Sequence, residues 1–344
     1  MNDFDRGIPP RLKKYRKKVS DSIESYLAGK QGKLYDMVNY HLGFDGEGSD
    51  GNLQGKGIRS SLVLYTTEAL GGDPDRALPA ALSLELIHNF SLVHDDIQDD
   101  DRTRRGRPTV QYKWSPEQAI NAGDGIKDLS LLIMRDLSPD DEPEKTLEAL
   151  GALGDYSLRM IQGQVMDLDY MKRQDVDIES YLEMIGAKTC SLLESAFHLG
   201  GIYASTSEEE IDKLVSFGRY LGYVYQIRDD WLGIWGRPEE SGKSVLSDIE
   251  EKKRSFPVVF AFQEGEGERL SRLKDLYYRE GKLGKDKVEE VRNILEELNA
   301  GEKTNEWAEK FWNEAEKQLR DMEMADWAKT DLKDFGSFLL TRKK

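Results

Sequence analysis

Cysteine is nearly absent from the sequence: Cys190 is the only one among 344 residues. One thiol excludes an internal disulfide framework and a multi-cysteine metal site, and it fits a reducing compartment. No run approaches the roughly 18 apolar residues that a membrane-spanning helix needs, and the first residues lack the apolar core of a signal peptide. We therefore expect a soluble, cytoplasmic protein without a transmembrane segment.

Signals for β-strands are absent as well. The sequence shows no alternation of apolar and polar residues, no Gly-x-Gly-x-x-Gly after a predicted strand and no internal repeat, whereas apolar residues recur at helical spacing. These patterns predict an all-α fold. With 38% apolar residues, the chain can bury a substantial core as one large domain or two ordinary ones. Six glycines between positions 43 and 57 predict a long flexible loop there.

Basic residues are fewer than acidic residues in this chain. The chain has 49 Lys and Arg against 65 Asp and Glu, which gives a formal net charge of −16. Outside local basic clusters such a protein repels a phosphate polymer, so nucleic acid is not an expected partner.

One stretch, from Ser91 to Gly106, concentrates five aspartates and three arginines. If the apolar run before it is helical, Asp95 and Asp99 lie one turn apart on one face, with Asp96 beside them. Divalent cations relieve the repulsion among such carboxylates, and hard oxygen ligands suit Mg²⁺ or Mn²⁺. A plain alternative is an acidic helix end that leads into a polar loop.

Arg104 and Arg105 weaken that plain alternative. Forked guanidinium groups beside a carboxylate cluster that binds metal are what a diphosphate requires. Lys56 and Arg59 add a second basic pair at a predicted helix start, where neighbouring glycines let the backbone approach an anion. Taken alone, that pair is as well explained as plain surface.

A second pair of carboxylates, Asp229 and Asp230, ends another apolar stretch, with Gln226 one turn earlier. The segment beyond it brings Lys243, Lys252 and Lys253 within loop reach of these aspartates. Two carboxylate-bearing helix ends with basic residues from several loops describe a site in which Mg²⁺ ions bridge a diphosphate, beside apolar helices that hold a hydrocarbon tail. This combination predicts ionisation of an allylic diphosphate, whose carbocation reacts with a second molecule.

Together these residues resemble the trans-isoprenyl diphosphate synthases, also called polyprenyl synthetases. The resemblance runs from Lys56 to Arg342. It implies an isoprenoid synthase fold, in which residues 1–344 form a single large helical bundle around a central substrate cavity. It also implies a homodimeric enzyme that uses three Mg²⁺ ions, or Mn²⁺, to condense isopentenyl diphosphate with dimethylallyl, geranyl or farnesyl diphosphate.

The resemblance also implies roles for individual residues. In the family's first aspartate-rich motif, Mg²⁺ and the allylic diphosphate are held by Asp95, Asp96 and Asp99, and Arg104 also contacts that diphosphate. The site for isopentenyl diphosphate corresponds here to Lys56, Arg59, His88 and Arg105. The second metal and diphosphate half corresponds to Lys188, Thr189, Gln226, Asp229, Asp230, Lys243 and Lys253, with Thr189 and Gln226 near the forming cation.

The chain departs from the family pattern at several positions. Gly233 stands where many relatives have the third aspartate of the second motif, so one carboxylate fewer is available for a metal there. Gln54, Gly57 and Ser60 stand where the family commonly shows Gly, Arg and Pro. Arg237 replaces a frequent acidic residue.

Product length has a physical basis in the residues just before the first motif. Phe90 lies five residues before Asp95 and Ser91 lies four before it, so an aromatic ring one turn from the metals can form the floor of the tail pocket. In the family a lone aromatic at this position resembles the archaeal type that makes C20 geranylgeranyl diphosphate. We expect a C20 product, with C15 or C25 as alternatives and ordinary core packing as the plain reading of Phe90.

Three rival functions fit parts of the pattern. A class I terpene cyclase shares the all-α fold and an Asp-rich motif, but the set Lys56, Arg59, His88 and Arg105 is redundant for it. A di-iron bundle could use Glu85-x-x-His88, but that fold needs the motif twice. The third is a non-catalytic or weakly active subunit of a heteromeric prenyl synthase.

Overall fold

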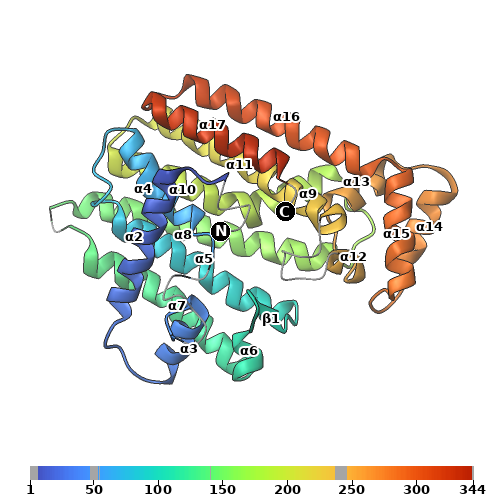
Figure 1. Ribbon diagram of the computed structural model, residues 1–344, viewed down its shortest axis with the longest axis horizontal. Coiled ribbons are helices and arrows are strands. Elements are labelled where there is room, and N and C mark those ends of the chain that lie inside the picture. Colours follow the sequence, from blue (N-terminus) through green and yellow to red (C-terminus); the bar gives the residue numbers. More distant parts are fainter. Residues whose placement is uncertain (1–6, 47–52, 54, 140, 237–245, 343–344) are drawn as a thin grey trace.

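The computed structural model describes residues 7–46, 53, 55–139, 141–236 and 246–342. The expected all-α fold is confirmed: in this described part, helices are broken only by turns, loops and one short hairpin (Figure 1). The helices of the N-terminal half are α2 (Pro10–Leu27), α3 (Lys33–Leu42), α4 (Ile58–Ala69), α5 (Leu78–Gln98), α6 (Val110–Lys113), α7 (Pro116–Leu137) and α8 (Pro143–Tyr170). The hairpin pairs β1 (Thr103–Arg104) with β2 (Arg107–Pro108).

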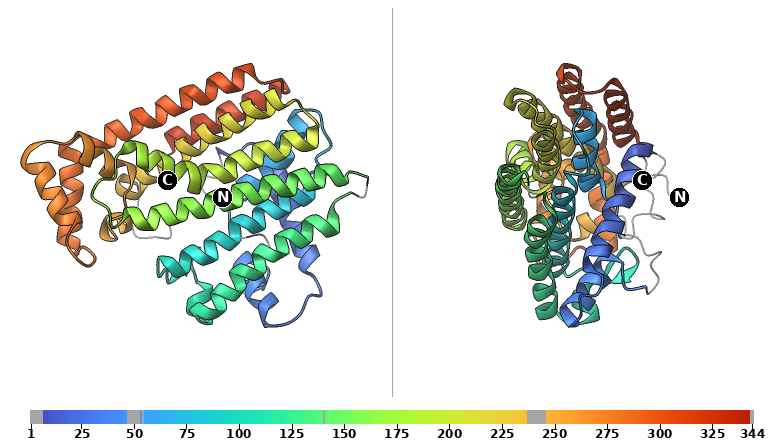
Figure 2. Two further views of the ribbon diagram at one scale, coloured as in Figure 1. Left: turned by 180° about the vertical axis from the view of Figure 1, so that it is seen from behind. Right: turned by 90° about the vertical axis from the view of Figure 1, so that its left-hand side faces the viewer.

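The second half continues as helices. They are α9 (Ile178–Ile185), the π-helical turn η1 (Gly186–Cys190), α10 (Ser191–Ala204), α11 (Glu208–Trp235), α12 (Ser247–Glu250), α13 (Phe256–Glu264), α14 (Gly267–Tyr277), α15 (Lys285–Glu297), α16 (Ala300–Asp321) and α17 (Asp326–Thr341). Helices α16 and α17 lie along one side of the bundle above α11, while α2 crosses the face turned to the viewer (Figure 1). Seen edge-on, α2 lies on one flank and α8 on the opposite flank (Figure 2).

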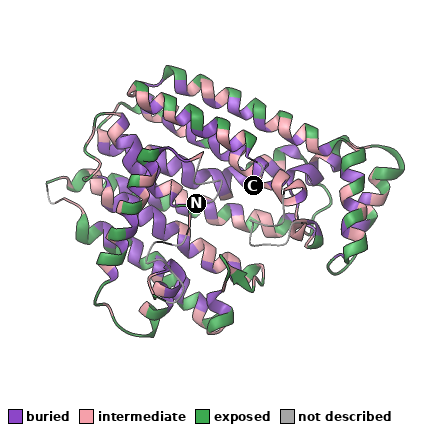
Figure 3. Ribbon diagram, viewed as in Figure 1, coloured by how far each residue is buried: buried purple, intermediate pink, exposed green. Residues whose placement is uncertain are grey.

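Helix α5 is the buried axis of this arrangement. Its apolar residues are covered on most sides, and Pro79 stands in its first turn, where a missing N–H costs nothing (Figure 3). The sequence predicts a helix from Arg76 to Val93 that carries the first aspartates at its C-terminal end. The helix in fact continues to Gln98, so Asp95 and Asp96 belong to its last turn and Asp99 caps it.

Two apolar clusters hold the described residues together. The larger cluster runs through the long helices from α2 to α17. The smaller one gathers residues of α12 to α15 with Ile234 of α11 and Ala300 of α16. The helices of the smaller cluster project at the end of the bundle where α5 and α11 finish, so they lie beside the carboxylate-bearing helix ends (Figure 1).

A π-helical turn lies in the middle of the apolar stretch predicted as one helix from Tyr181 to Leu199. Lys188 and Thr189 interrupt the apolar pattern of this stretch, and the structure has η1 there, between α9 and α10. Single π turns inserted in α-helices alter the direction of side chains and occur often at functional sites. Helix α8 packs closely against this turn, because Gly163 approaches its backbone without a side chain.

Replacing Gly163 with alanine should displace the π turn. A Cβ at this position would lie 2.2 Å from the backbone nitrogen of Lys188, which requires backbone to move. We expect a loss of roughly 1–3 kcal/mol in the free energy of unfolding, the usual cost of overpacking.

Gly154→Ala on the same helix is the matched control, since nothing lies within 4 Å of its Cβ position. There the better helix propensity of alanine should stabilise the protein by up to about 1 kcal/mol. Thermal unfolding of both variants measures the difference. Equal melting temperatures would contradict the close packing of α8 on η1.

Candidate active site

The first aspartate cluster is split between three environments. Asp96 is 2% exposed, and its carboxylate accepts hydrogen bonds from Arg104 Nε at 2.7 Å and Nη2 at 2.6 Å. Arg104 comes from the β1 strand, so the hairpin is fastened to α5 by this ion pair. Burial opposes the charge of Arg104, but the hydrogen bond to Asp96 raises its pKa. Asp96 therefore positions an arginine as much as it offers oxygens to a metal.

Asp95 faces a cavity instead. Burial raises its pKa, and the strongest opposing influence is the positive charge of Lys188 on the π turn. Lys188 donates a hydrogen bond to Asp167 of α8 at 2.5 Å. Burial disfavours the lysine's charge, but Asp167 and Asp95 together raise its pKa. One cation is thus shared by carboxylates from two helices.

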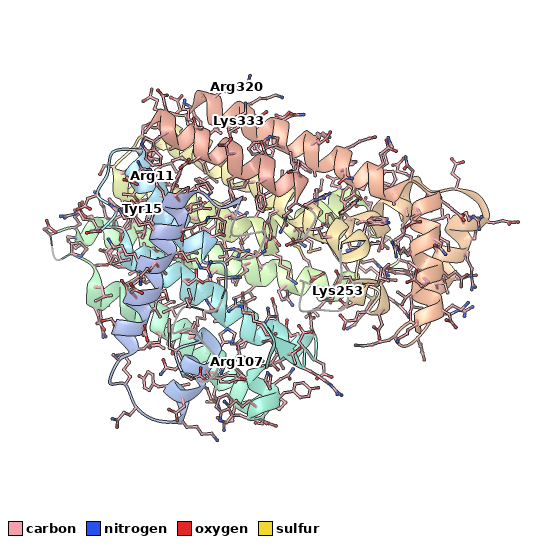
Figure 4. All side chains as sticks on the ribbon, viewed as in Figure 1. Arg11, Tyr15, Arg107, Lys253, Arg320 and Lys333 are labelled. Atoms are coloured by element: carbon pink, nitrogen blue, oxygen red, sulfur yellow. The ribbon has the colours of Figure 1, made fainter. Side chains whose placement is uncertain are left out.

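Asp99 is bound from the opposite wall. Lys253, in the segment between α12 and α13, donates a hydrogen bond to Asp99 Oδ2 at 3.0 Å (Figure 4). This contact joins residues 154 apart in the sequence. Burial opposes the charge of Lys253, while Asp99 and Asp248 raise its pKa.

The two aspartates of the second motif point in different directions. Asp230 accepts hydrogen bonds from the Tyr181 hydroxyl at 2.6 Å, the Phe256 backbone N–H at 2.7 Å and Gln226 Nε2 at 2.9 Å. Burial nevertheless raises its pKa to about 7. Asp229 is half-buried and forms an ion pair with Arg342 at the end of α17.

The π turn connects these groups. Thr189 donates a hydrogen bond to Gln226 at 2.8 Å, and Gln226 in turn donates to Asp230. A cavity of about 200 Å³ lies beside this chain of bonds. Its polar wall consists of Asp167, Tyr181, Lys188, Thr189, Gln226, Asp230, Asp248, Lys253, Arg254 and Ser255. The described residues predicted for the second diphosphate half thus share one cavity, apart from Asp229, which does not line it.

A second cavity, of about 300 Å³, gathers the other predicted cations. It is lined by Lys56, Arg59, His88, Arg104 and Arg105 together with Glu85, Tyr225, Phe335 and Leu339. Arg59 donates a hydrogen bond to His88 Nε2 at 3.2 Å. Burial and then the charge of Arg59 hold the pKa of His88 well below its usual value, so this imidazole stays neutral at pH 7.

Ser60 has a use that the family's proline lacks. Its hydroxyl donates to the buried Glu85 carboxylate at 2.6 Å. This contact also argues against the di-iron bundle. Glu85 accepts hydrogen bonds from Ser60 and Asn89, so it is not directed with His88 toward a shared metal.

A third cavity, of about 370 Å³, is called the apolar cavity because it contains an apolar wall formed by Phe90, Leu92, Met160, Ile161 and Leu192. The rest of its lining is polar or charged and includes Ser91, His94, Asp95, Lys127 and Lys188. The Phe90 ring is 4% exposed. It packs edge-on against His94 at 5.7 Å, with Lys127 Nζ 5.5 Å from its centroid.

The sequence analysis missed Asp167, Tyr181 and Asp248 as site residues. Asp167 interrupts an apolar helix, which was a usable signal. Asp248 lies beside Gly233, since a Cβ at Gly233 would be 3.0 Å from its Oδ2 atom. A carboxylate from the α12 segment therefore occupies the space next to the position where many relatives carry an aspartate.

Some predictions fall outside the described residues, namely those for Gln54, Arg237 and Lys243 and much of the glycine-rich loop. Within the described residues, no three Asp, Glu, His or Cys side chains gather into a ready-made metal site. The carboxylates are held instead by Lys188, Lys253 and two arginines. In the same part of the chain, no helix is both long and apolar enough to cross a membrane.

The fold and these cavities define a helical protein whose central site combines carboxylates, several cations and an apolar pocket. The polyprenyl synthetase family model matches residues 49–298, and the chain belongs to that family.

Relatives of known name support the assignment. The (2E,6E)-farnesyl diphosphate synthase of Mycobacterium tuberculosis is 40% identical over 231 residues, which cover 67% of this chain and 63% of that relative, so the match spans less than two thirds of its length. The geranylgeranyl diphosphate synthase of Saccharolobus solfataricus is 33% identical over 91% of each chain. The crystal structure of geranylgeranyl pyrophosphate synthetase from Pyrococcus horikoshii superposes with a TM-score of 0.85 at 32% identity, covering 99% of this chain and 100% of that one.

An added carboxylate at Gly233 should make the site dependent on divalent cations. In Gly233→Asp the new carboxylate lies beside Asp248, and without metal the like charges repel. We expect a loss of about 1 kcal/mol, or a few degrees in melting temperature, in EDTA. Magnesium should restore most of it, because a cation between the carboxylates reverses the repulsion.

Gly233→Asn controls for size without adding charge. Thermal unfolding with EDTA and with Mg²⁺ should separate the two variants only in EDTA. If the aspartate and asparagine variants melt together under both conditions, Asp248 does not share a cation site with position 233.

Proposed function

We propose that the protein is a short-chain trans-prenyltransferase, which condenses isopentenyl diphosphate with an allylic diphosphate. The observation that carries this proposal is that the three cavities adjoin one another through shared lining residues. The cation-rich cavity and the apolar cavity share Arg59, His88 and Leu92. The apolar cavity and the carboxylate cavity share Lys188 and Thr189. Two diphosphates can therefore bind on either side of one hydrocarbon pocket.

Divalent cations fit the acidic part of this site. Burial raises the pKa of Asp95, which means that its negative charge is costly without a cation. Asp95, Asp99 and Asp230 offer oxygens to Mg²⁺, while Asp96 and Asp229 are held by Arg104 and Arg342 and would join the metals once these arginines release them. Carboxylates of this kind suit Mg²⁺ or Mn²⁺. Three bound ions would supply positive charge to the leaving diphosphate.

The chain's own cations complete the stabilisation of the leaving group. Lys188 and Lys253 lie beside the carboxylates and can transfer their hydrogen bonds to diphosphate oxygens, and we assign Lys243 to the same task. Arg104, held by Asp96, faces the same end of α5. The oxygens of Thr189 and Gln226 lie next to the pocket, where their dipoles stabilise a forming carbocation.

In this proposal the second substrate binds in the cation-rich cavity. We assign isopentenyl diphosphate to Lys56, Arg59, His88 and Arg105. Neutral His88 accepts a hydrogen bond from Arg59 and so orients this guanidinium without adding charge. A terpene cyclase, which binds one diphosphate, has no use for this second cluster.

The direct test is an assay with labelled isopentenyl diphosphate, Mg²⁺ and dimethylallyl, geranyl or farnesyl diphosphate, followed by chain-length analysis of the dephosphorylated products. We expect C20 as the main product and no turnover in EDTA. Turnover by the purified chain alone would exclude the non-catalytic subunit. Absence of turnover with every primer would favour that alternative.

We also propose that residues 1–344 work as one cytoplasmic catalytic domain and as a homodimer. Its cavities are lined by residues from α4 to α17, which supports one unit. Support for the dimer comes from α7 and α8. Leu147, Leu158 and Val165 lie on one face of α8 because their spacings of 11 and 7 residues are close to whole helical turns. They are strongly exposed, as is Leu131 on α7, which runs beside α8 on the flank shown from behind (Figure 2).

Leu158→Glu should break the proposed dimer. Leu158 is 58% exposed, so the change costs the folded chain little, while a buried carboxylate across an apolar interface is costly. Light scattering after gel filtration should give twice 39.3 kDa for the unchanged protein and 39.3 kDa for the variant. The exposed Glu144→Lys, near the start of α8, serves as a control that keeps the larger mass. A monomeric unchanged protein would contradict the dimer.

Phe90→Ala should lengthen the product. Removing the ring opens the apolar cavity on the side of His94 and α7, so the growing chain can accept at least one more five-carbon unit. Product analysis with farnesyl diphosphate as primer measures the shift from C20 toward C25 or longer.

Phe90→Leu retains much of the side-chain volume and should keep C20 as the main product. An unchanged product distribution in the alanine variant, with normal turnover, would show that Phe90 does not form the floor.

A further inference from the structure

The segment Gly55-Lys56-Gly57 lies between two arginines. A Cβ at Gly55 would be 2.6 Å from Arg105 Nη2, so the guanidinium of Arg105 lies directly against this backbone. A Cβ at Gly57 would be 3.0 Å from Cγ of Arg16 and 3.7 Å from its Cβ and Cδ. Side chains at either glycine would therefore collide with an arginine, one from the hairpin and one from α2.

Arg16 reaches this segment from α2, which precedes it in the sequence and packs against α4 in the fold. It follows the buried Tyr15 on α2, which crosses in front of α4 and α5 (Figure 4). Arg16 is half-buried, and its stem fills the space beside Gly57 at the start of α4. Gly57 has a φ of +53°, a conformation that glycine adopts without strain. Glycine is therefore suited to this position both by its backbone conformation and because it has no side chain to meet Arg16.

Arg16 is not itself among the lining residues of the cation-rich cavity, but its charge acts on Arg105, which lines it. Burial of the guanidinium and then the charge of Arg104 lower the pKa of Arg105 to about 10, and Arg16 acts in the same direction. Much of the Arg105 side chain is exposed, but its charged end is crowded by these neighbours. Lys56, Arg59 and Arg104 line the same cavity, where Glu85 is the acidic lining residue. Such an excess of positive charge is stabilised by an anion.

We propose that Arg16 is a further diphosphate-binding residue of the isopentenyl diphosphate site, supplying from α2 a cation beside Gly57. The proposal rests on the prenyltransferase function for the identity of the substrate. The contact with Gly57 orients the stem of Arg16 toward the start of α4, where helix N–H groups already favour an anion. Many relatives have arginine at position 57. In this chain Gly57 leaves room for the stem of Arg16, so an arginine from α2 can take the place of the one at position 57.

Arg16→Gln tests the charge, with Arg16→Lys as the conservative variant and Lys14→Gln, exposed on the same helix, as the control. We expect the KM for isopentenyl diphosphate to rise about 10-fold in Arg16→Gln. The lysine variant should keep most of the affinity. In all variants, the KM for the allylic diphosphate and kcat should change less than twofold. The melting temperature should change by less than a few degrees.

Binding without turnover separates this proposal from the assigned activity. Calorimetric titration of inorganic diphosphate and of isopentenyl diphosphate should show the same order of affinity, with Arg16→Gln weakest. If the unchanged protein turns over no substrate but Arg16→Gln still loses diphosphate affinity, the prenyltransferase assignment fails and Arg16 remains a diphosphate ligand. Equal affinities of the Arg16→Gln and Lys14→Gln variants, or equal losses in the lysine and glutamine variants, overturn the role of Arg16.

Discussion

The structure depends on two lysines that neutralise two carboxylate-bearing helix ends. Helices α5 and α11 finish at the same end of the bundle, where negative charge also opposes the helix dipoles. Lys188 lies between Asp95 and Asp167, and Lys253 reaches Asp99 from the far wall. These contacts let buried carboxylates coexist before any metal binds. In the proposed reaction the same ammonium groups would lie beside the leaving diphosphate, because a diphosphate that brings its own metal ions could take over both partners of each ion pair.

Backbone geometry places these lysines. Lys188 and Thr189 belong to a π turn, and without it the α9–α10 segment would present other side chains to the cavity. Gly163 fixes the turn against α8 by allowing backbone contact. Lys253 follows a residue with positive φ, Lys252, so a sharp change of direction brings it back toward α5. The positions of Lys188 and Lys253 therefore depend on two local irregularities in an otherwise regular bundle, the π turn and the positive φ at Lys252.

The sequence was sufficient for the fold class, and the structure brings most of the predicted site residues together in three neighbouring cavities. Helical spacing placed Asp95 and Asp99 on one face, and the interruption at Lys188 was visible as polar residues in an apolar stretch. It could not show that Asp229 and Asp230 diverge, because neighbours on a helix differ by about 100° in direction and only tertiary partners decide which one is covered. Those partners, Arg342 and Tyr181, lie far away in sequence, and so does Asp248 beside Gly233.

Under the proposed function, the packing of Phe90 in the apolar cavity bears on product length. An aromatic ring limits a growing chain only if it cannot turn aside, and Phe90 is confined on two sides. His94 packs edge-on against it, and His94 is itself fixed by α7, since a Cβ at Gly123 would be 2.3 Å from the His94 Nε2 atom. Lys127 covers the ring from the same helix. If Phe90 forms the proposed floor, that floor is the contact between α5 and α7, and the limit on chain length would depend on the rigidity of this helix pair as well as on the ring.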